Sequence, residues 1–203
     1  MDRRESDEYD KVFSALNDDE KDDITGFTGR EKKLIWASWK KIIFGNEKGK
    51  FTINLVMWLF ENVPQMRERF DKFDAMHMKD EELVGDEHFL AHAQVLVFEL
   101  SRIIMLFPQP EKMIYRITQL ATSHLSQTPR VGKIYFGALH AKIHEFVIDD
   151  LKEPPNSEVV QLWTRLFGII YDVFVTEEDK LPPEDEHIPG KEADQKGCCC
   201  RIV

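Results

Sequence analysis

Apolar residues recur three or four positions apart along most of the chain, which is the spacing of an amphipathic helix. The clearest stripe lies between about Glu87 and Phe107 and consists of Phe89, Leu90, Ala93, Leu96, Val97, Leu100, Ile103 and Ile104. Pro108 and Pro110 follow it and predict its end. No stretch alternates apolar and polar residues between turn signals, so no strand is expected. The pattern predicts an all-α chain with short connections.

The same spacing predicts five further helices, which prolines and other turn signals separate. The first begins at Thr28-Gly29-Arg30-Glu31, which has the pattern of a capping box, and continues through the apolar positions of residues 34–43. The other four are expected at residues 51–62, 112–125, 133–147 and 157–175. Residues 64–80 are expected to form a short turn of helix and an irregular link.

The formal net charge of −10 is concentrated at the two ends of the chain. Residues 1–27 carry ten acidic and four basic side chains, and residues 176–203 carry eight and four, which leaves nineteen of each kind for residues 28–175. Acidic ends argue against a nucleic-acid partner and are typical of solvated segments. We therefore expect a disordered N-terminal extension at 1–27, one folded domain at 28–178 and a flexible tail at 179–203.

Two histidines are set in apolar helical stretches. His92 lies at the edge of the long stripe, and His124 follows Leu120-Ala121-Thr122-Ser123 near a helix end. Each of them alone is typical of a buried histidine that is hydrogen-bonded to a carbonyl group. Together with Phe70 and Phe73, they suggest one imidazole on each side of a flat aromatic pocket, which is what holding a haem requires.

The order and spacing of these residues resemble the globin family over about residues 28–178. Phe60, Pro64, Phe70 and Phe73 fall in register with the myoglobin-like pattern, and residues 120–124 match its proximal segment at four of five positions. His92 and His124 stand 32 positions apart, which is slightly more than in that pattern. The resemblance implies a globin fold, a 3-over-3 helical sandwich around a haem pocket.

The resemblance also implies a role toward haem b for each matched residue. His124 would be the proximal iron ligand, with Ser123 orienting its ring through a hydrogen bond. His92 would face a bound gas on the distal side or bind the iron as a sixth ligand. The other pocket residues implied are Val56, Phe70, Phe73, Leu96, Leu120 and, at the propionate rim, Lys72.

All three cysteines stand together at 198–200, so the core has none for a disulfide. The sequence Cys200-Arg201-Ile202-Val203 has the form of a prenylation signal, and Cys198 and Cys199 would then be candidates for palmitoylation. Adjacent acylated cysteines could supply the second lipid that stable membrane binding needs. The sequence begins without the pattern of a secretory signal, so we expect a cytoplasmic protein. Lipidated cysteines would tether it to the cytoplasmic face of a membrane, and the alternative is a tail whose cysteines are unmodified.

The expected function is reversible binding of oxygen and other diatomic gases, used for sensing or redox signalling if the tail is lipidated. Two other functions stay open. One is a haem-free globin-like module that binds other proteins, and the other is a haem redox enzyme that acts on nitric oxide or peroxide. An enzyme would need a reductase partner or a proximal carboxylate, and no acidic residue adjoins His124. We therefore expect a binding protein rather than an enzyme.

Overall fold

The computed structural model describes residues 3–45, 50–70 and 75–183. Along the chain the elements are α1 (Arg3–Ser14), α2 (Gly29–Phe44), α3 (Lys50–Asn62), the 3-10 helix η1 (Pro64–Arg69), α4 (Asp80–Leu83), α5 (Glu87–Met105), α6 (Pro110–Leu125), α7 (Lys133–Leu151) and α8 (Glu158–Glu178). Within these residues no strand forms, and one isolated bridge joins Lys21 to Thr28. The prediction of an all-α chain is confirmed.

The helices begin where local side chains can satisfy the first backbone N–H groups. The capping box predicted at Thr28 is present, because its side chain accepts a hydrogen bond from the Glu31 amide and the Glu31 carboxylate accepts one from the Thr28 amide. The Asp86 carboxylate caps α5 by accepting from two amides of its first turn. At the start of α6, Pro110 occupies the first turn, where its missing N–H costs no hydrogen bond.

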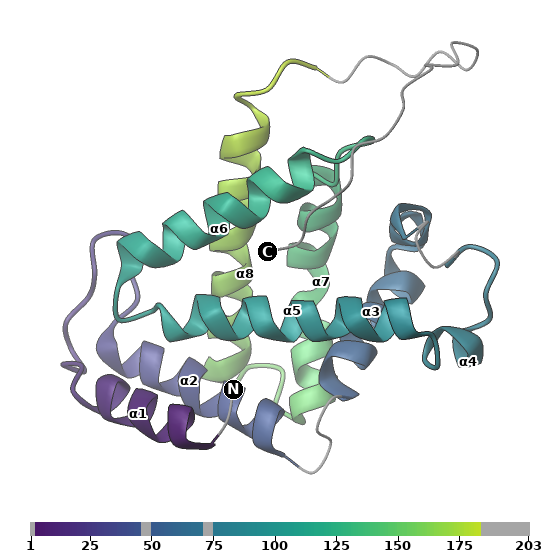
Figure 1. The fold of residues 1–203 in the computed structure, drawn as a ribbon. Coiled ribbons are helices and arrows are strands. Elements are labelled where there is room, and N and C mark those ends of the chain that lie inside the picture. The colour runs from purple at the N-terminus through teal and green to yellow at the C-terminus, as the bar shows by residue number, and fades with distance from the viewer. Residues whose placement is uncertain (1–2, 46–49, 71–74, 184–203) are drawn as a thin grey trace.

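The long helices form two crossing layers of three. Figure 1 shows α5 and α6 crossing α7 and α8, and packing contacts join α2 to α5, α5 to α6, α3 to α7 and α7 to α8. Further contacts of α8 with α2 and α6, and of α3 with α5, connect the layer of α2, α5 and α6 to that of α3, α7 and α8. The predicted 3-over-3 arrangement is confirmed.

Two buried tryptophans lie at the crossing of these layers. The rings of Trp39 and Trp163 lie 6.0 Å apart between centroids. The indole N–H of Trp39 donates to the Ser101 hydroxyl, and that of Trp163 donates to the Ser38 hydroxyl. Because both of these indole N–H groups have an acceptor, the two rings are buried without an unpaired donor.

Helix α8 is long and apolar enough to cross a membrane by length and composition alone. In this fold its apolar side chains serve the core instead, because Trp163, Leu166 and Phe174 are buried and the helix packs against α2, α6 and α7. A long apolar helix that is covered on several sides is typical of the interior of a helical domain.

The expected disorder of residues 1–27 is wrong for the part of this segment that the structure describes. Helix α1 packs on α2, where the Phe13 ring stacks on Trp36 at 5.1 Å between centroids and is 2% exposed. The Asp10 carboxylate accepts hydrogen bonds from the Trp36 indole and from Lys40. Asp7 and Glu8 of α1 are exposed, while Tyr9 and Phe13 supply an apolar inner face that composition alone hides.

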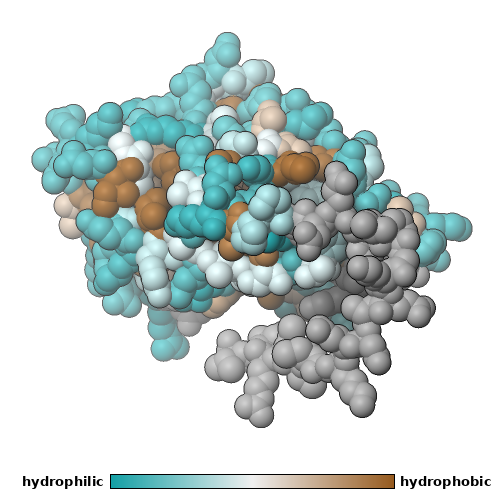
Figure 2. Space-filling view, turned by 90° about the horizontal axis from the view of Figure 1, so that it is seen from above, coloured by the Kyte–Doolittle hydropathy of each residue, from teal (hydrophilic) through white to brown (hydrophobic). Residues whose placement is uncertain are grey.

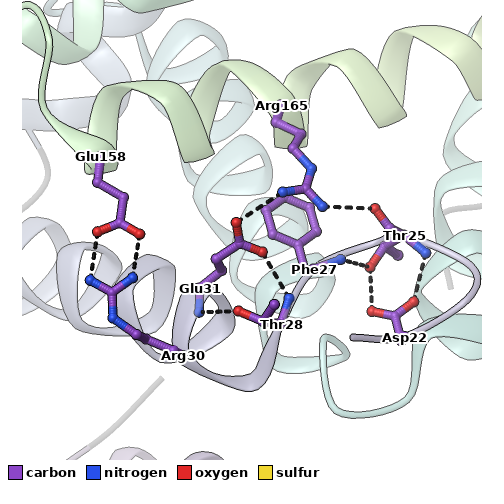
Figure 3. A network of polar contacts seen from close by, with 8 residues as sticks. All are labelled: Asp22, Thr25, Phe27, Thr28, Arg30, Glu31, Glu158 and Arg165. Atoms are coloured by element: carbon purple, nitrogen blue, oxygen red, sulfur yellow. Dashed lines mark hydrogen bonds and ion pairs between the residues drawn. The ribbon is translucent and has the colours of Figure 1, made fainter. Parts of the chain in front are cut away.

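The segment between α1 and α2 is also built into the fold (Figure 3). The Asp22 carboxylate accepts from the amide and the hydroxyl of Thr25, which closes a tight turn. Arg165 from α8 lies over the Phe27 ring at 4.0 Å and donates to Glu31 of α2 and to the Thr25 carbonyl. One arginine therefore joins the extension, α2 and α8.

The outer surface is mainly polar on the face that Figure 2 shows, where hydrophobic residues stand in separate patches among hydrophilic ones. The most exposed large apolar side chains of the described residues are Phe98, Val95, Tyr115 and Ile134. Exposed apolar residues in small numbers are normal on a folded surface.

Candidate functional site

Helix α6 carries His124 in its last turn, where the ring is half-buried. Its Nδ1 atom lies 2.9 Å from the backbone carbonyl oxygen of Leu120. Because a carbonyl oxygen can only accept, Nδ1 must carry the proton and Nε2 keeps its lone pair. Metal-binding histidines commonly have this second hydrogen bond, which fixes the ring and makes the free nitrogen a better ligand.

Aromatic rings from two other helices flank His124. The edges of Phe136 of α7 and Phe174 of α8 meet the imidazole at centroid distances of 5.4 and 5.7 Å. Burial lowers the pKa of His124 below its ordinary value, although the Leu120 carbonyl and the charge of Glu99 oppose that shift. The imidazole is therefore neutral at neutral pH, which is the form that can bind a metal.

Helix α5 carries His92 at the second turn after the Asp86 cap. The imidazole meets the Phe70 ring edge-on at 4.8 Å between centroids, and Phe70 in turn packs edge-on against Phe60 of α3 at 5.0 Å. His92 is half-buried. Aromatic support from α3 and the end of η1 thus fixes the position of this second imidazole.

Three of the predicted lining residues lie in or beside the core. Val56 of α3 is 2% exposed. Leu96 of α5 and Leu120 of α6 are half-buried and pack against the core, and each stands one helical turn from the histidine of its own helix. The structure thus places the two imidazoles on α5 and α6 and these apolar side chains on α3, α5 and α6.

The predicted role of Ser123 differs from what the structure shows. Its side chain is exposed, and the acceptor that orients His124 is the carbonyl of Leu120, four residues earlier. Every residue in a helix has such a carbonyl behind it, and a histidine in the last turn can reach one. This partner could therefore have been predicted from helix geometry alone.

Sequence reasoning also missed an ion pair between α5 and α6. The guanidinium of Arg116 makes two contacts with the Glu99 carboxylate, one of them an Nε to Oε2 hydrogen bond of 2.8 Å. The sequence holds one indication of this pair, which is the position of its two members. Glu99 stands two turns after His92, and Arg116 stands two turns before His124.

Several predicted site residues lie outside the described residues. These are Lys72 and Phe73, which follow Phe70, and the cysteines Cys198, Cys199 and Cys200. Their predicted roles stay predictions. Arg130, which stands in the link between α6 and α7, donates to the backbone carbonyl of Pro182.

The described residues fit a haem. A neutral imidazole with a free Nε2 lone pair stands on one helix, a second imidazole stands on the helix that packs beside it, and the side chains around them are aromatic or aliphatic. A porphyrin needs such a donor and such an apolar environment. Oxygen-rich or thiolate groups, which other metals prefer, do not cluster among the described residues.

Comparisons with known proteins agree with this geometry. The Globin family model matches residues 56–174. The globin of Biomphalaria glabrata is 35% identical over 139 residues, which are 68% of this chain and 90% of that protein. Extracellular globin-E1 of Artemia sp. is 30% identical over 137 residues, which are 65% of this chain and 68% of that protein.

Solved structures share the fold. Ferric myoglobin from Aplysia limacina aligns with a TM-score of 0.64 at 20% identity, covering 74% of this chain and 98% of that one. A globin from Drosophila melanogaster aligns with a TM-score of 0.63 at 23% identity, and the alignment covers 74% of this chain and 94% of that one. These solved structures show that the chain has the globin fold. The Globin family model, which matches more than half of the sequence, shows the family. The chain therefore belongs to the globin family, the haem proteins that bind diatomic gases.

Proposed function

We propose that this globin binds haem b through Nε2 of His124 and reversibly binds oxygen beside His92. The observation that carries the proposal is the 2.9 Å contact between Nδ1 of His124 and the Leu120 carbonyl, because it leaves Nε2 as a fixed, unprotonated donor. Haem would supply, when bound, an iron that takes a nitrogen ligand from the protein and binds a diatomic gas.

The chain contributes orientation and exclusion of water. Phe136 and Phe174 restrict the His124 ring, and Phe70 restricts His92. A ring N–H of His92 would donate a hydrogen bond to the gas ligand, and the apolar side chains of Val56 and Leu96 would keep water from that position. A hydrogen bond in a water-poor site is stronger than the same bond in water.

The test is the absorption spectrum of the purified protein after haemin is supplied, in ferric, ferrous and carbon-monoxide forms. We expect haem bands that His124→Ala weakens and that added imidazole restores, since imidazole can replace the missing side chain. His140→Ala is the matched control, because His140 is also half-buried but stacks on Tyr171 between α7 and α8. A protein that takes up no haem would favour the haem-free interaction module.

The ferrous spectrum also separates the uses of the haem. A five-coordinate spectrum would favour reversible oxygen binding. A six-coordinate spectrum with His92 as the second ligand would favour electron transfer or redox sensing. Turnover of nitric oxide or peroxide in the presence of a reductase would make the protein an enzyme.

We also propose that lipids on Cys198, Cys199 and Cys200 tether this cytoplasmic globin to a membrane. Three consecutive cysteines support this proposal, because adjacent acyl chains together give the stable binding that one chain does not. A tethered globin suits gas sensing or local signalling better than bulk transport. Mass spectrometry of the native protein tests the proposal, and unmodified cysteines in protein from its own cells would end it.

A further inference from the structure

Helices α5 and α6 form a wedge, which we define as α5, residues 106–109 and α6. The two helices are joined at residues 106–109 and move apart from there (Figure 1). His92 lies on one side of the wedge and His124 on the other. Positions 92, 96, 99 and 103 share one face of α5, and positions 113, 116, 120 and 124 share one face of α6.

The Glu99–Arg116 ion pair joins these two faces. Nε of Arg116 donates to Oε2 of Glu99 at 2.8 Å, and Nη2 contacts Oε1. Nη1 of Arg116 also donates to the Gln119 side chain. The side chains of Arg116 and Glu99 are only 21% and 13% exposed. A two-point contact between a guanidinium and a carboxylate fixes both distance and orientation, and reduced solvent access strengthens it.

The ion pair stands midway between the closed end of the wedge and the histidines. Glu99 is seven residues from Leu106 and seven from His92, while Arg116 is seven residues from Gln109 and eight from His124. At 1.5 Å of rise per residue, each half of the wedge measures roughly 10 to 12 Å. A small change of separation at the ion pair is therefore about doubled at the histidines.

The aromatic contacts described for the two histidines come from different elements. His92 packs on Phe70, which belongs with α3 and η1, whereas His124 packs on Phe136 and Phe174 of α7 and α8. Nothing in these aromatic contacts joins one histidine to the other. The ion pair, by contrast, directly connects the helix of one histidine to the helix of the other.

We propose that Glu99 and Arg116 are positioning residues that set the opening of the wedge and thereby the distance of His92 from the ligand site of His124. The consequence for gas binding rests on the proposed haem function. The consequence for the separation of the helices does not, so the two can be tested apart.

The first test measures helix separation in the haem-free full chain. Nitroxide labels on cysteines placed at the exposed positions Ala91 and Ser123 report the distance across the wedge by pulsed electron resonance, with the native cysteines changed to serine. In Glu99→Gln we expect a broader distribution whose mean is longer by roughly 2 Å, since loosening at the ion pair is doubled at the labels. An unchanged distribution would overturn the proposal.

A matched control is available elsewhere in the chain. Arg30 and Glu158 form another two-point ion pair, which joins α2 to α8 and is 57% and 43% exposed. Glu158→Gln should leave the distance between the labels unchanged. Arg116→Lys keeps the charge but loses the two-point geometry, so its distance distribution should lie between those of the wild type and Glu99→Gln. This variant replaces Glu99→Gln in the test if Glu99→Gln does not fold.

The second test uses the haem-loaded protein and a double-mutant cycle. With His92 present, Glu99→Gln should speed oxygen dissociation by about threefold or more, and in the His92→Leu background it should have no effect, because the coupling runs through His92. If the wild-type ferrous haem is six-coordinate, the six-coordinate fraction should fall instead. An equal effect in both backgrounds would show general loosening and overturn the proposal. Failure of the protein to take up haem would end the proposed function but leave the distance test intact.

Discussion

At the scale of single residues, one hydrogen bond decides which nitrogen of His124 can act as a ligand. Nδ1 of His124 donates a hydrogen bond to the Leu120 carbonyl, and burial lowers the pKa of the ring. His92 belongs to a different helix and meets the Phe70 ring edge-on. In the proposed function these two imidazoles have different tasks, namely ligation by His124 and hydrogen bonding by His92.

The hydrogen-bonding task of His92 can be tested directly. His92→Leu keeps an apolar side chain of similar size but removes the donor, so oxygen should dissociate roughly tenfold faster, which corresponds to a hydrogen bond of about 1.4 kcal/mol. Stopped-flow replacement of oxygen by carbon monoxide measures the rate. The exposed His88, one turn earlier on α5, provides the control variant His88→Leu. An unchanged rate in His92→Leu would remove His92 from the distal site.

A single glycine sets how closely the N-terminal extension approaches α2. A Cβ atom on Gly29 would lie 2.0 Å from the carbonyl oxygen of Asn17, and that oxygen belongs to the backbone. Gly29→Ala should therefore cost about 1 to 3 kcal/mol of unfolding free energy, measured by urea denaturation. Gly85→Ala is the comparison, since its Cβ would meet its nearest neighbour at an ordinary 3.5 Å. Equal costs for both variants would mean that the close contact relaxes easily.

At the scale of elements, α1 extends the fold beyond the family match, which begins at residue 56. It attaches through the Phe13–Trp36 stack and through Asp10, whose carboxylate accepts from Trp36 and Lys40. An isolated helix of this length is marginal in water, so its stability comes from packing on α2.

Removing the central side chain of that interface should release α1. Phe13→Ala should cost about 3 kcal/mol, the usual range for losing a buried phenylalanine, and urea denaturation should show a lower midpoint. Val12→Ala controls for helix propensity, because Val12 is 40% exposed on the same helix. If Phe13→Ala cost no more than Val12→Ala, the packing of α1 would contribute nothing to stability.

The elements that the sequence predicts well are those whose apolar stripes are long and whose ends carry prolines or capping residues. Helix α5 has both features, and the structure places it at Glu87–Met105, close to the expected bounds. Helix α1 has neither, because its stripe is short and ten acidic residues surround it in residues 1–27. The Glu99–Arg116 pair escaped prediction for another reason. Its spacing from the two histidines is visible in the sequence, but charged side chains on a helix usually face water, so the spacing alone does not indicate a contact.

At the scale of the whole molecule, Asp22 helps to join the N-terminal extension to the globin layers. Its carboxylate lies 2.8 Å from Nζ of Lys32 on α2 and also accepts from Thr25. The side chains of Lys32 and Asp22 are only 7% and 15% exposed. The neighbouring cation–π contact of Arg165 with Phe27 continues the connection to α8 (Figure 3). Loss of the Asp22 charge should therefore affect the attachment of the whole extension.

The free energy of unfolding should therefore depend on the protonation of Asp22. Burial alone would raise the pKa of Asp22, but hydrogen bonds from Lys32 and Thr25 and the lysine charge outweigh it and lower the pKa from 3.8 to about 2. A carboxylate whose folded pKa is depressed contributes stability above its unfolded pKa and loses it as the pH falls toward the folded one. Asp22 should therefore contribute about 2 kcal/mol at neutral pH, and this contribution should disappear between about pH 4 and pH 2.

The measurement compares unfolding free energies of the wild type and Asp22→Asn across this range. The amide has no charge to lose, so the two curves should differ most above pH 5 and converge as the wild-type carboxylate is protonated. Subtracting the curves removes the acid sensitivity of every other carboxylate that both proteins share. Asp23→Asn, at the exposed neighbouring position, should give a curve that follows the wild type throughout. Curves for Asp22→Asn and the wild type that stay parallel down to pH 2 would show that the charge of Asp22 does not hold the extension, because its loss would then change nothing.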